Sequence, residues 1–348
     1  MALILGIESS CDESAAALIR DDRSILAHRL ASQEAAHRPY GGVVPEIAAR
    51  AHVESLPPLI VGVLDEAGIA LEDCDAVAAT SGPGLIGGVM IGMVMGKALA
   101  MAAGKPFLAI NHLEGHALSP RLDDASLAFP YLLLLVSGGH CQILRVKGPG
   151  DYARLATTID DALGEAFDKT AKLLGLGYPG GPAVERMALD GDPEAVPLPR
   201  PLLGSDEPHF SFAGLKSAVL RAVESGRHAS ADIAASFQQA AIDCVVDRLN
   251  HALRAMDDEA PVTRLVVAGG VAANQRVRSA LEMLAGDHGL AFSAPPSWLC
   301  TDNAAMIGWA GMERFLTGDK GDPLDFQARP RWPLDSAAPA ARGAGIKA

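Results

Sequence analysis

The sequence predicts an α/β protein with two related domains around a central cleft. Short apolar strands alternate with helical segments, a pattern typical of a largely parallel sheet covered by helices. A unit of strand, polar turn and strand opens the chain and returns near residue 131. The 348 residues also exceed the size at which a single core stops growing, roughly 250–300 residues. A duplicated fold accounts for these observations, and a cleft between domains favours ligand binding.

The first half of the chain shows strand patterns separated by turns and two helical patterns. The predicted strands cover residues 3–8, 15–19, 25–31, 76–80 and 106–110. Helical periodicity covers residues 43–67 and 88–103. Because proline lacks an N–H, Pro57 and Pro58 are expected to break or kink the first of these helices.

The second half repeats the opening and then becomes mainly helical. Strands are predicted at residues 131–136, 141–146 and 265–268. Helices are predicted at 163–174, 182–189, 213–224, 232–256, from about 274, and at 302–315. These patterns predict a first domain of residues 1–125 plus 302–332 and a second of 126–301. Residues 333–348 are rich in Ala, Pro and Gly, so we expect a disordered tail.

Charge and cysteine content restrict the class of protein. The net charge of −13 disfavours binding to nucleic acid by this chain alone, because nucleic acid is itself negatively charged. RNA binding would therefore need a local basic patch or a partner. No signal peptide is recognisable, and the apolar run 89–103 is too short for a membrane span and carries Lys97. Five scattered cysteines without a C-x-x-C motif indicate thiols in a reducing cytoplasm.

Two histidines four residues apart indicate a metal site. His112 and His116 would share one face of a helix at the spacing that suits chelation. Two solvent-exposed histidines, or histidines at the N-terminus of a helix, are the alternative. Asp302 is a candidate third ligand, although it could instead cap the helix that follows it. Two histidines and a carboxylate leave open coordination positions and suit iron(II) or zinc.

A zinc protease is a weaker interpretation of the same segment. That motif requires a glutamate directly after the first histidine, to act as the general base. Leu113 holds this position, and Glu114 follows one residue late. On a helix this turns the carboxylate about 100° from the required direction.

Two strand–glycine turns are candidates for binding a phosphate. Residues 135–139 end a predicted strand with a turn of small residues, and their backbone N–H groups could approach an anion. Gly269 and Gly270 end another strand before a helix, where Asn274 would cap the helix or contact a ligand. A hairpin turn and tight strand–helix packing are the alternatives. The five residues of the first turn are Leu135, Val136, Ser137, Gly138 and Gly139.

Further polar residues stand near these turns or at the start of the chain. Asp168 would hold a ribose or an amino group, or else pair with Lys172. Gly181 lies in a rigid Pro-Gly loop, and Glu185 on the helix after it is ambiguous. The polar turn after the first strand places Glu8, Asp12 and Glu13 close together, as in an acid–base or metal–phosphate site, or in a polar hairpin turn.

Nine segments in order resemble one family, the tRNA threonylcarbamoyladenosine synthesis family once labelled O-sialoglycoprotein endopeptidases. Each segment is modest alone, but the set covers nearly everything before the tail. The segments are residues 6–13, 41–46, 111–116, 136–140, 167–169, 178–182, 210–216, 268–274 and 300–305.

The resemblance implies a duplicated fold shared with actin, sugar kinases and Hsp70 (the ASKHA fold). It implies a metal, iron(II) or alternatively zinc, on His112, His116 and Asp302. It also implies an adenylate donor, threonylcarbamoyl-AMP, held by the 135–139 loop and by Asp168, Gly181, Glu185 and Asn274.

The activity implied is transfer of the threonylcarbamoyl group to N6 of the adenosine 3′ of the anticodon, in tRNAs reading codons that begin with A, with release of AMP. Bacterial members work with an inactive-paralogue subunit and a small P-loop ATPase, and a separate synthase makes the donor. Candidates for a general base are Asp12, Glu13 and His140. A small-molecule carbamoyltransferase of the same fold is the alternative enzyme, and a non-catalytic nucleotide-binding scaffold is the alternative outside enzymes.

Overall fold

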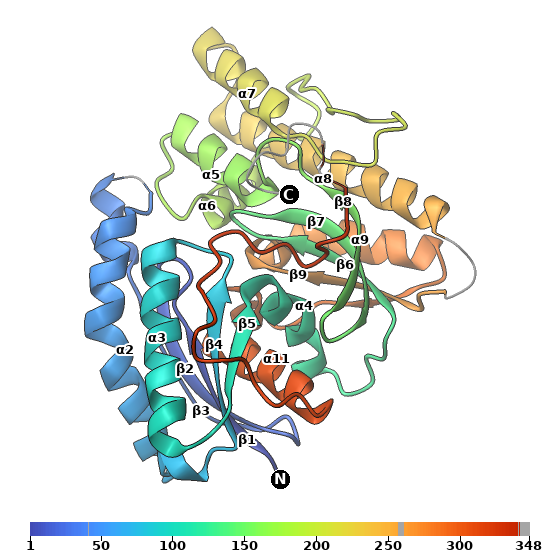
Figure 1. Cartoon of the computed structure of the whole chain (residues 1–348). Helices are drawn as coiled ribbons and strands as arrows, with labels where there is room; N and C mark the ends of the chain where they lie inside the picture. The colour runs from blue at the N-terminus through green and yellow to red at the C-terminus, as the bar shows by residue number, and fades with distance from the viewer. Residues whose placement is uncertain (41, 257–260, 340, 342–348) are drawn as a thin grey trace. The chain divides into compact units, whose positions relative to one another are not determined.

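The computed structural model describes residues 1–40, 42–256, 261–339 and 341. The chain forms two compact units (Figure 1). Unit 1 consists of Met1–Leu127, Gly148–Asp151 and Thr301–Ser336, and unit 2 of Ala128–Lys147, Tyr152–Cys300 and Ala337–Ala348. Gly41 of the 41–46 motif lies outside the described residues, as do residues 340 and 342–348 of the tail that the sequence predicts to be disordered.

Unit 1 contains a mixed five-stranded sheet with the order β3-β2-β1-β4-β5. β1 pairs antiparallel with β2 and parallel with β4, and β4 pairs parallel with β5. The parallel strands therefore end at one edge of the sheet, where β1 finishes at Glu8. The strands are β1 (Leu3–Glu8), β2 (Glu13–Arg20), β3 (Ile25–Ser32), β4 (Ala76–Gly82) and β5 (Phe107–Asn111).

Unit 2 contains a second five-stranded sheet with the equivalent order β8-β7-β6-β9-β10. β6 again pairs antiparallel with the next strand, β7, and parallel with the later strand β9. The duplicated α/β fold is therefore confirmed, but both sheets are mixed rather than largely parallel, because each opens with a hairpin. The strands are β6 (Tyr131–Val136), β7 (Cys141–Gly148), β8 (Asp151–Thr157), β9 (Arg264–Ala268) and β10 (Ala291–Ser293).

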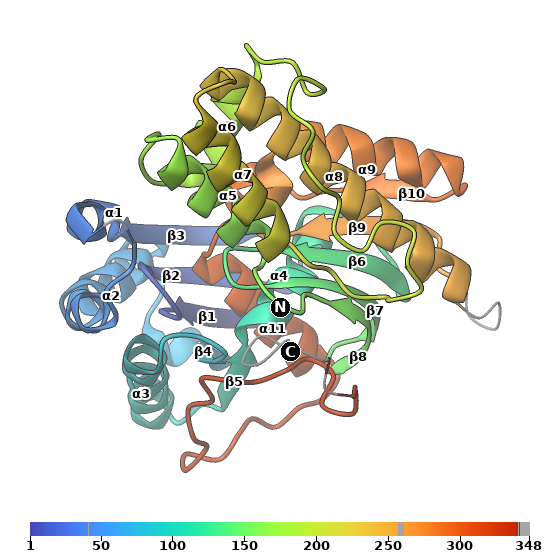
Figure 2. The same ribbon diagram turned by 90° about the horizontal axis from the view of Figure 1, so that it is seen from above.

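Helices cover both faces of the unit 1 sheet (Figures 1 and 2). α2 (Pro45–Ala67) and α3 (Ile86–Ala103) pack on one face with a core that includes Leu5 and Ile7 of β1. α11 (Ala304–Leu316) packs on the other face, where Gly6 lies against it. Because side chains alternate along a strand, Glu8 points to the same side as Gly6. α4 (His112–Asp123) lies beside α11.

α2 continues through Pro57 and Pro58, so the predicted break is wrong. The two prolines leave the carbonyl groups of Val53 and Glu54 without their helical donors. All four of these residues are exposed, so water can satisfy the carbonyl groups. The break is therefore absent, and the kink that the sequence also allows stays a prediction.

Two helices, α2 and α3, are long and apolar enough to cross a membrane by length and composition alone. α3 begins at Ile86, so it is longer than the apolar run from which the sequence analysis excluded a membrane span. Both helices pack one face on the sheet of unit 1, as core helices of soluble proteins also do. The finding is weak evidence for a membrane span.

Unit 2 has its own core, formed where the sheet meets the surrounding helices. Leu132, Leu134 and Val136 of β6 contribute to it together with Phe167 and Phe237, whose rings meet edge to face. The helices are α5 (Leu163–Leu173), α6 (Gly180–Ala188), α7 (Ala213–Ser225), α8 (Ser230–Ala255), α9 (Gln275–Asp287) and the short α10 (Ser297–Cys300). The sequence did not predict β8, β10, α10 or the short α1 (Glu34–His37).

We predict that Gly6→Ala destabilises the fold by about 1–3 kcal/mol, the usual cost of overpacking. A Cβ atom at this position would lie 2.5 Å from the carbonyl oxygen of Ala304 and 2.6 Å from the backbone nitrogen of Gly308. Backbone atoms cannot swing away as a side chain can. Thermal unfolding would measure the loss. Gly286→Ala is the control, because its Cβ would meet nothing within 4 Å and its helix favours alanine. Equal melting temperatures for the two variants would contradict the prediction.

Candidate active site

The candidate metal ligands on α4 follow directly from the end of β5. Asn111 ends the strand and caps the helix, since its side-chain oxygen accepts a hydrogen bond from the backbone nitrogen of Leu113 at 2.9 Å. Its amide nitrogen donates to the carbonyl oxygen of Trp332, 2.9 Å away. His112 is therefore the first residue of a helix whose start is held by both polar groups of the Asn111 side chain. The oxygen binds the first turn of α4, and the nitrogen binds Trp332.

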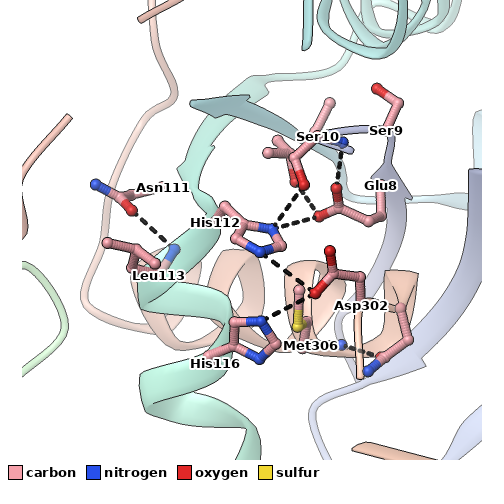
Figure 3. A network of polar contacts seen from close by, with 12 residues as sticks. Glu8, Ser9, Ser10, Asn111, His112, Leu113, His116, Asp302 and Met306 are labelled. Atoms are coloured by element: carbon pink, nitrogen blue, oxygen red, sulfur yellow. Dashed lines mark hydrogen bonds and ion pairs between the residues drawn. The ribbon is translucent and has the colours of Figure 1, made fainter. Parts of the chain in front are cut away.

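His112, His116 and Asp302 form a compact cluster in unit 1 (Figure 3). One ligand atom from each lies within 4.8 Å of the others. The Nε2 atom of His116 lies 3.1 Å from Oδ1 of Asp302, and the Nε2 atom of His112 lies 3.4 Å from the same oxygen. Both histidines are buried, so they are not solvent-exposed, although His112 does begin α4 as the other part of that alternative expects.

Asp302 does not cap the helix that follows it. Asn303 is the N-cap of α11, and its side chain accepts a hydrogen bond from the backbone nitrogen of Met306 at 2.9 Å. This leaves the carboxylate of Asp302 free of a structural role at the helix end. It points instead toward the two histidines (Figure 3).

Glu8 adds a second carboxylate to the cluster; the sequence grouped it with Asp12 and Glu13 in an acid–base or metal–phosphate site, but not with the two histidines. Its Oε2 atom lies 3.1 Å from Nδ1 of His112 and accepts a hydrogen bond from Thr80 at 2.6 Å. Its Oε1 atom accepts from the backbone nitrogen of Ser10 at 2.5 Å. A charged residue ending an otherwise apolar strand was the signal available in the sequence.

The charges of the cluster stabilise one another. Burial would raise the pKa of Asp302, but the positive charge of His112 and hydrogen bonds from both histidines hold that pKa well below its usual range. Burial would lower the pKa of His112, but Asp302 and Glu8 raise it well above its usual value. Asp302 is therefore an anion at neutral pH, as a metal ligand must be.

The polar turn after β1 holds Cys11, Asp12 and Glu13. Burial, reinforced by the charges of Asp302 and Asp12, raises the pKa of Glu13 to about 9. Glu13 is therefore largely neutral near pH 7 and is a poor general base there. Burial also raises the pKa of the Cys11 thiol, which excludes a reactive thiolate at neutral pH.

A buried hydrogen-bond network holds this turn against α2. The Nε2 atom of His52 donates to the carbonyl oxygen of Cys11 at 3.1 Å, and Nδ1 accepts from the amide nitrogen of Gln33 at 3.4 Å. Ser14 donates to Nδ1 at 2.8 Å. Gln33 connects His52 to His37, whose Nδ1 in turn accepts from the backbone nitrogen of Val44 at 3.3 Å. The network ties the 41–46 motif to the turn that carries Asp12 and Glu13.

The glycines of α3 allow this helix to approach the same turn. A Cβ atom on Gly88 would lie 2.4 Å from the carbonyl oxygen of Ser9 and 2.9 Å from Nε2 of His52. Ser9 also donates its hydroxyl to the carbonyl oxygen of Gly88 at 2.9 Å. The glycine-rich run therefore has a packing function beside the site.

Glu114 faces away from the histidine cluster. Its Oε1 atom accepts a hydrogen bond from the backbone nitrogen of Gly150 at 2.8 Å, in the turn before β8. It therefore has a different direction from the general base of a zinc protease, in agreement with its late position in the motif.

In unit 2 the predicted phosphate turns meet at the carboxyl ends of β6 and β9. Leu135 of β6 pairs with Ala268 of β9, so the turns after both strands lie at one edge of the sheet. Ser137 and His140 close the first turn, the backbone nitrogen of Ser137 donating to the carbonyl oxygen of His140 at 2.8 Å. The start of α5 joins this edge, because Gly164 donates to the carbonyl oxygen of Ser137.

The other predicted substrate residues of unit 2 already have protein partners. Asp168 accepts a hydrogen bond from the backbone nitrogen of Gly180, next to Gly181, at 2.9 Å. Glu185 accepts from the backbone nitrogen of Gln275 at 2.7 Å. Asn274 caps α9 through Val277 and donates to Gln238 at 2.9 Å. These bonds bring the starts of α6 and α9 together.

Solved structures with the same fold define the class of protein. HypF in its phosphate- and nucleotide-bound form matches with a TM-score of 0.62 and 14% identity, over 92% of this chain and 56% of that chain. Component A of the (R)-2-hydroxyglutaryl-CoA dehydratase of Acidaminococcus fermentans matches with a TM-score of 0.52 and 17% identity, over 89% and 97% of the chains. With the duplicated sheets, these likenesses assign the chain to the ASKHA fold class.

Sequence comparison identifies the family within that class. The sequence model of the tRNA N6-adenosine threonylcarbamoyltransferase family matches residues 24–309. The transferase of Sphingopyxis alaskensis is 72% identical over 348 residues, covering 100% of both chains. That of Zymomonas mobilis is 66% identical, covering 100% of this chain and 96% of its own. The chain belongs to this family, and it is an enzyme that transfers a threonylcarbamoyl group to N6 of an adenosine in tRNA.

We predict that His52 makes the fold sensitive to acid. Burial lowers the pKa of His52, and this outweighs the opposing hydrogen bond to Cys11 and the charges of Glu8 and Asp12. The unfolded chain therefore takes up the proton first. Stability should be complete above the unfolded pKa, about 6.5, and should fall as the pH falls through the lower folded pKa.

Denaturant unfolding at pH 7.5 and 5.5 would measure this effect. His52→Gln keeps a donor and an acceptor but cannot be protonated, so it should lose less stability between the two pH values than the unmodified chain. His228→Gln, at a partly exposed position, is the control. An unchanged pH dependence in His52→Gln would show that other groups cause the acid sensitivity.

Proposed function

We propose that the chain takes its threonylcarbamoyl group from threonylcarbamoyl-AMP and binds one divalent metal ion in unit 1. The acceptor is the adenosine 3′ of the anticodon in tRNAs that read codons beginning with A, and AMP is released. One observation carries the proposal: Asp302, 186 residues after His116, directs a carboxylate oxygen at the imidazole nitrogens of two buried histidines on one helix.

The residues of the cluster fit a metal ion. Two imidazole nitrogens and one anionic oxygen form a set that suits iron(II), with zinc as the alternative, and leave positions open for substrate. His112 and His116 are four residues apart on α4, so the helix itself places both side chains on one face, as chelation of one ion requires. When bound, the ion would polarise the carbamoyl oxygen as a Lewis acid.

Unit 2 holds the adenylate through residues at the carboxyl ends of β6 and β9. The turn of Ser137, Gly138 and Gly139 offers backbone N–H groups, and nothing within 4 Å would meet a Cβ atom at either glycine or at Gly181. The remaining contacts come from Leu135, Val136, Asp168, Glu185 and Asn274. Asn274 uses one donor and one acceptor inside the protein, so its amide keeps one further donor and lone pair for the ligand.

The transfer requires a group that accepts the proton of the attacking amine. N6 of the adenosine forms a bond to the carbamoyl carbon, the bond from that carbon to the AMP oxygen breaks, and N6 gives up one proton. Asp12 is the better base of the two acidic candidates, because Glu13 is largely neutral near pH 7. Glu13 can instead donate a hydrogen bond.

The chain works with an inactive-paralogue subunit of the same fold and a small P-loop ATPase, and a synthase supplies the donor. An exposed apolar surface supports a protein partner. On α3, Ile86, Met90, Val94 and Met101 are each at least 45% exposed and follow one helical face. Monomeric soluble proteins rarely expose apolar stripes of this length. The net charge of −13 also favours a partner that helps to bind tRNA.

A cytoplasmic location follows from the substrate and from the cysteines. The acceptor is tRNA. The five cysteines are all free thiols, as expected in a reducing compartment.

We predict that His116→Ala loses both bound metal and transfer activity, because two remaining ligands chelate weakly. The assay combines the chain and its partners with unmodified tRNA, labelled threonine, bicarbonate, ATP and the donor synthase. Metal content is measured on the same preparation, and label in tRNA should fall at least 100-fold. His228→Ala is the control. Full transfer activity in His116→Ala would exclude a role for the metal in the reaction. If the unmodified chain with working partners puts no label into tRNA, threonylcarbamoyl-AMP is not its donor.

We predict that Met90→Glu prevents assembly with the paralogue subunit, because it places a charge in the middle of the exposed stripe of α3. Size-exclusion chromatography of the mixed subunits would show the complex with the unmodified chain and separate peaks with the variant. Met283→Glu changes a methionine on α9 that is more exposed, 67% against 49% for Met90, and should leave the complex intact. Normal assembly by Met90→Glu would place the partner elsewhere.

A further inference from the structure

Glu8 is a fully buried carboxylate whose contacts set the orientation of His112. Its side chain has no exposed surface, so its charge must be satisfied by protein groups. Ser10 and Thr80 donate to its two oxygens at 2.5 and 2.6 Å. Both donors lie at the carboxyl edge of the sheet, so protein groups alone fix the position of the Glu8 carboxylate.

The ring of His112 lies between the two carboxylates of the cluster. Nδ1 faces Oε2 of Glu8 at 3.1 Å, with the hydroxyl of Ser10 at the same distance, while Nε2 faces Asp302 (Figure 3). An ionised carboxylate only accepts hydrogen bonds, so Glu8 keeps the proton on Nδ1. When the ring is neutral, as a metal ligand must be, its lone pair is then left on Nε2, the nitrogen directed at Asp302 and His116.

His116 has no comparable support. Among the residues that the structure describes, its buried Nδ1 atom has no hydrogen-bond partner. The two histidines of α4 are therefore unequal, and the orientation of the pair depends on the one that is anchored.

We propose that Glu8 is a positioning residue for the metal site, which holds His112 in the Nδ1–H tautomer and directs its Nε2 atom at the ion. Thr80 supports it by fixing the same carboxylate oxygen. The proposal rests on the metal site of the proposed function. Carboxylate partners of this kind orient and strengthen histidine ligands, and their removal typically costs 10–100-fold in metal affinity.

The test is the affinity of the metal-free full-length chain for Co²⁺, whose d–d absorption reports both binding and ligand geometry. Glu8→Gln should raise the dissociation constant about 10–100-fold with an unchanged shape of the absorption spectrum. Thr80→Val should raise the dissociation constant less. Because this variant keeps the Glu8 carboxylate, it still tests the proposal if Glu8→Gln fails to fold. Glu8→Asp, which keeps the charge, should restore part of the affinity.

Two controls match the chemistry of these changes. Glu114→Gln removes a buried carboxylate of α4 that faces Gly150, and Ser81→Ala removes a buried hydroxyl that donates to Ala79 instead of Glu8. Both should bind Co²⁺ like the unmodified chain. Unchanged affinity in Glu8→Gln and Thr80→Val would overturn the proposal. An altered spectrum in Glu8→Gln would also overturn it, because Glu8 would then be a ligand.

The same titration separates this proposal from the metal site itself. His116→Ala should abolish Co²⁺ binding if the cluster binds metal. Unchanged binding in His116→Ala, or no binding by the unmodified chain, would reject the metal site and the positioning role together. Loss in His116→Ala with full affinity in the Glu8 and Thr80 variants would reject the positioning role alone.

Discussion

The parallel pairing of β1 with β4, and of β4 with β5, is the constraint on which the candidate metal cluster depends. It brings three strand ends to one edge of the sheet, where Glu8, Thr80 and Asn111 stand. Alternation along β1 then turns Glu8 to the side of the sheet covered by α11. Asp302 precedes that helix, and His112 begins the helix after β5. The cluster is thus a consequence of strand order and side-chain direction.

Unit 2 uses the same constraint for a different set of groups. The ends of β6 and β9 carry small residues and backbone N–H groups where unit 1 carries carboxylates and imidazoles. The two copies share their strand order but offer opposite chemistry, one suited to a cation and the other to an anion.

Much of the fold and of the cluster could be predicted from the sequence. Apolar runs located most strands, and the His112–His116 spacing with the family motifs located the residues of the candidate metal cluster. The sequence could not show that Asn303 rather than Asp302 caps α11, since either side chain can cap a helix. The sequence singled out Glu8 with Asp12 and Glu13, but not its contact with His112, because the two residues are 104 positions apart. The sequence did not predict β10, because a three-residue strand is too short to show a pattern. It also could not show that Pro57 and Pro58 face solvent, where a helix can continue through them.

The distance of Asp302 from α4 in the sequence has a consequence for synthesis on the ribosome. His116 and Asp302 are 186 residues apart, and Trp332, which bonds to Asn111, comes later still. All of unit 2 up to Cys300 lies between them in the chain. A nascent chain can therefore complete the core of unit 2 before the cluster of unit 1 has its aspartate. Unit 1 starts first, but its cluster is completed only after most of unit 2 has been synthesised, and a chain released before Asp302 would carry an imidazole pair without its acidic partner.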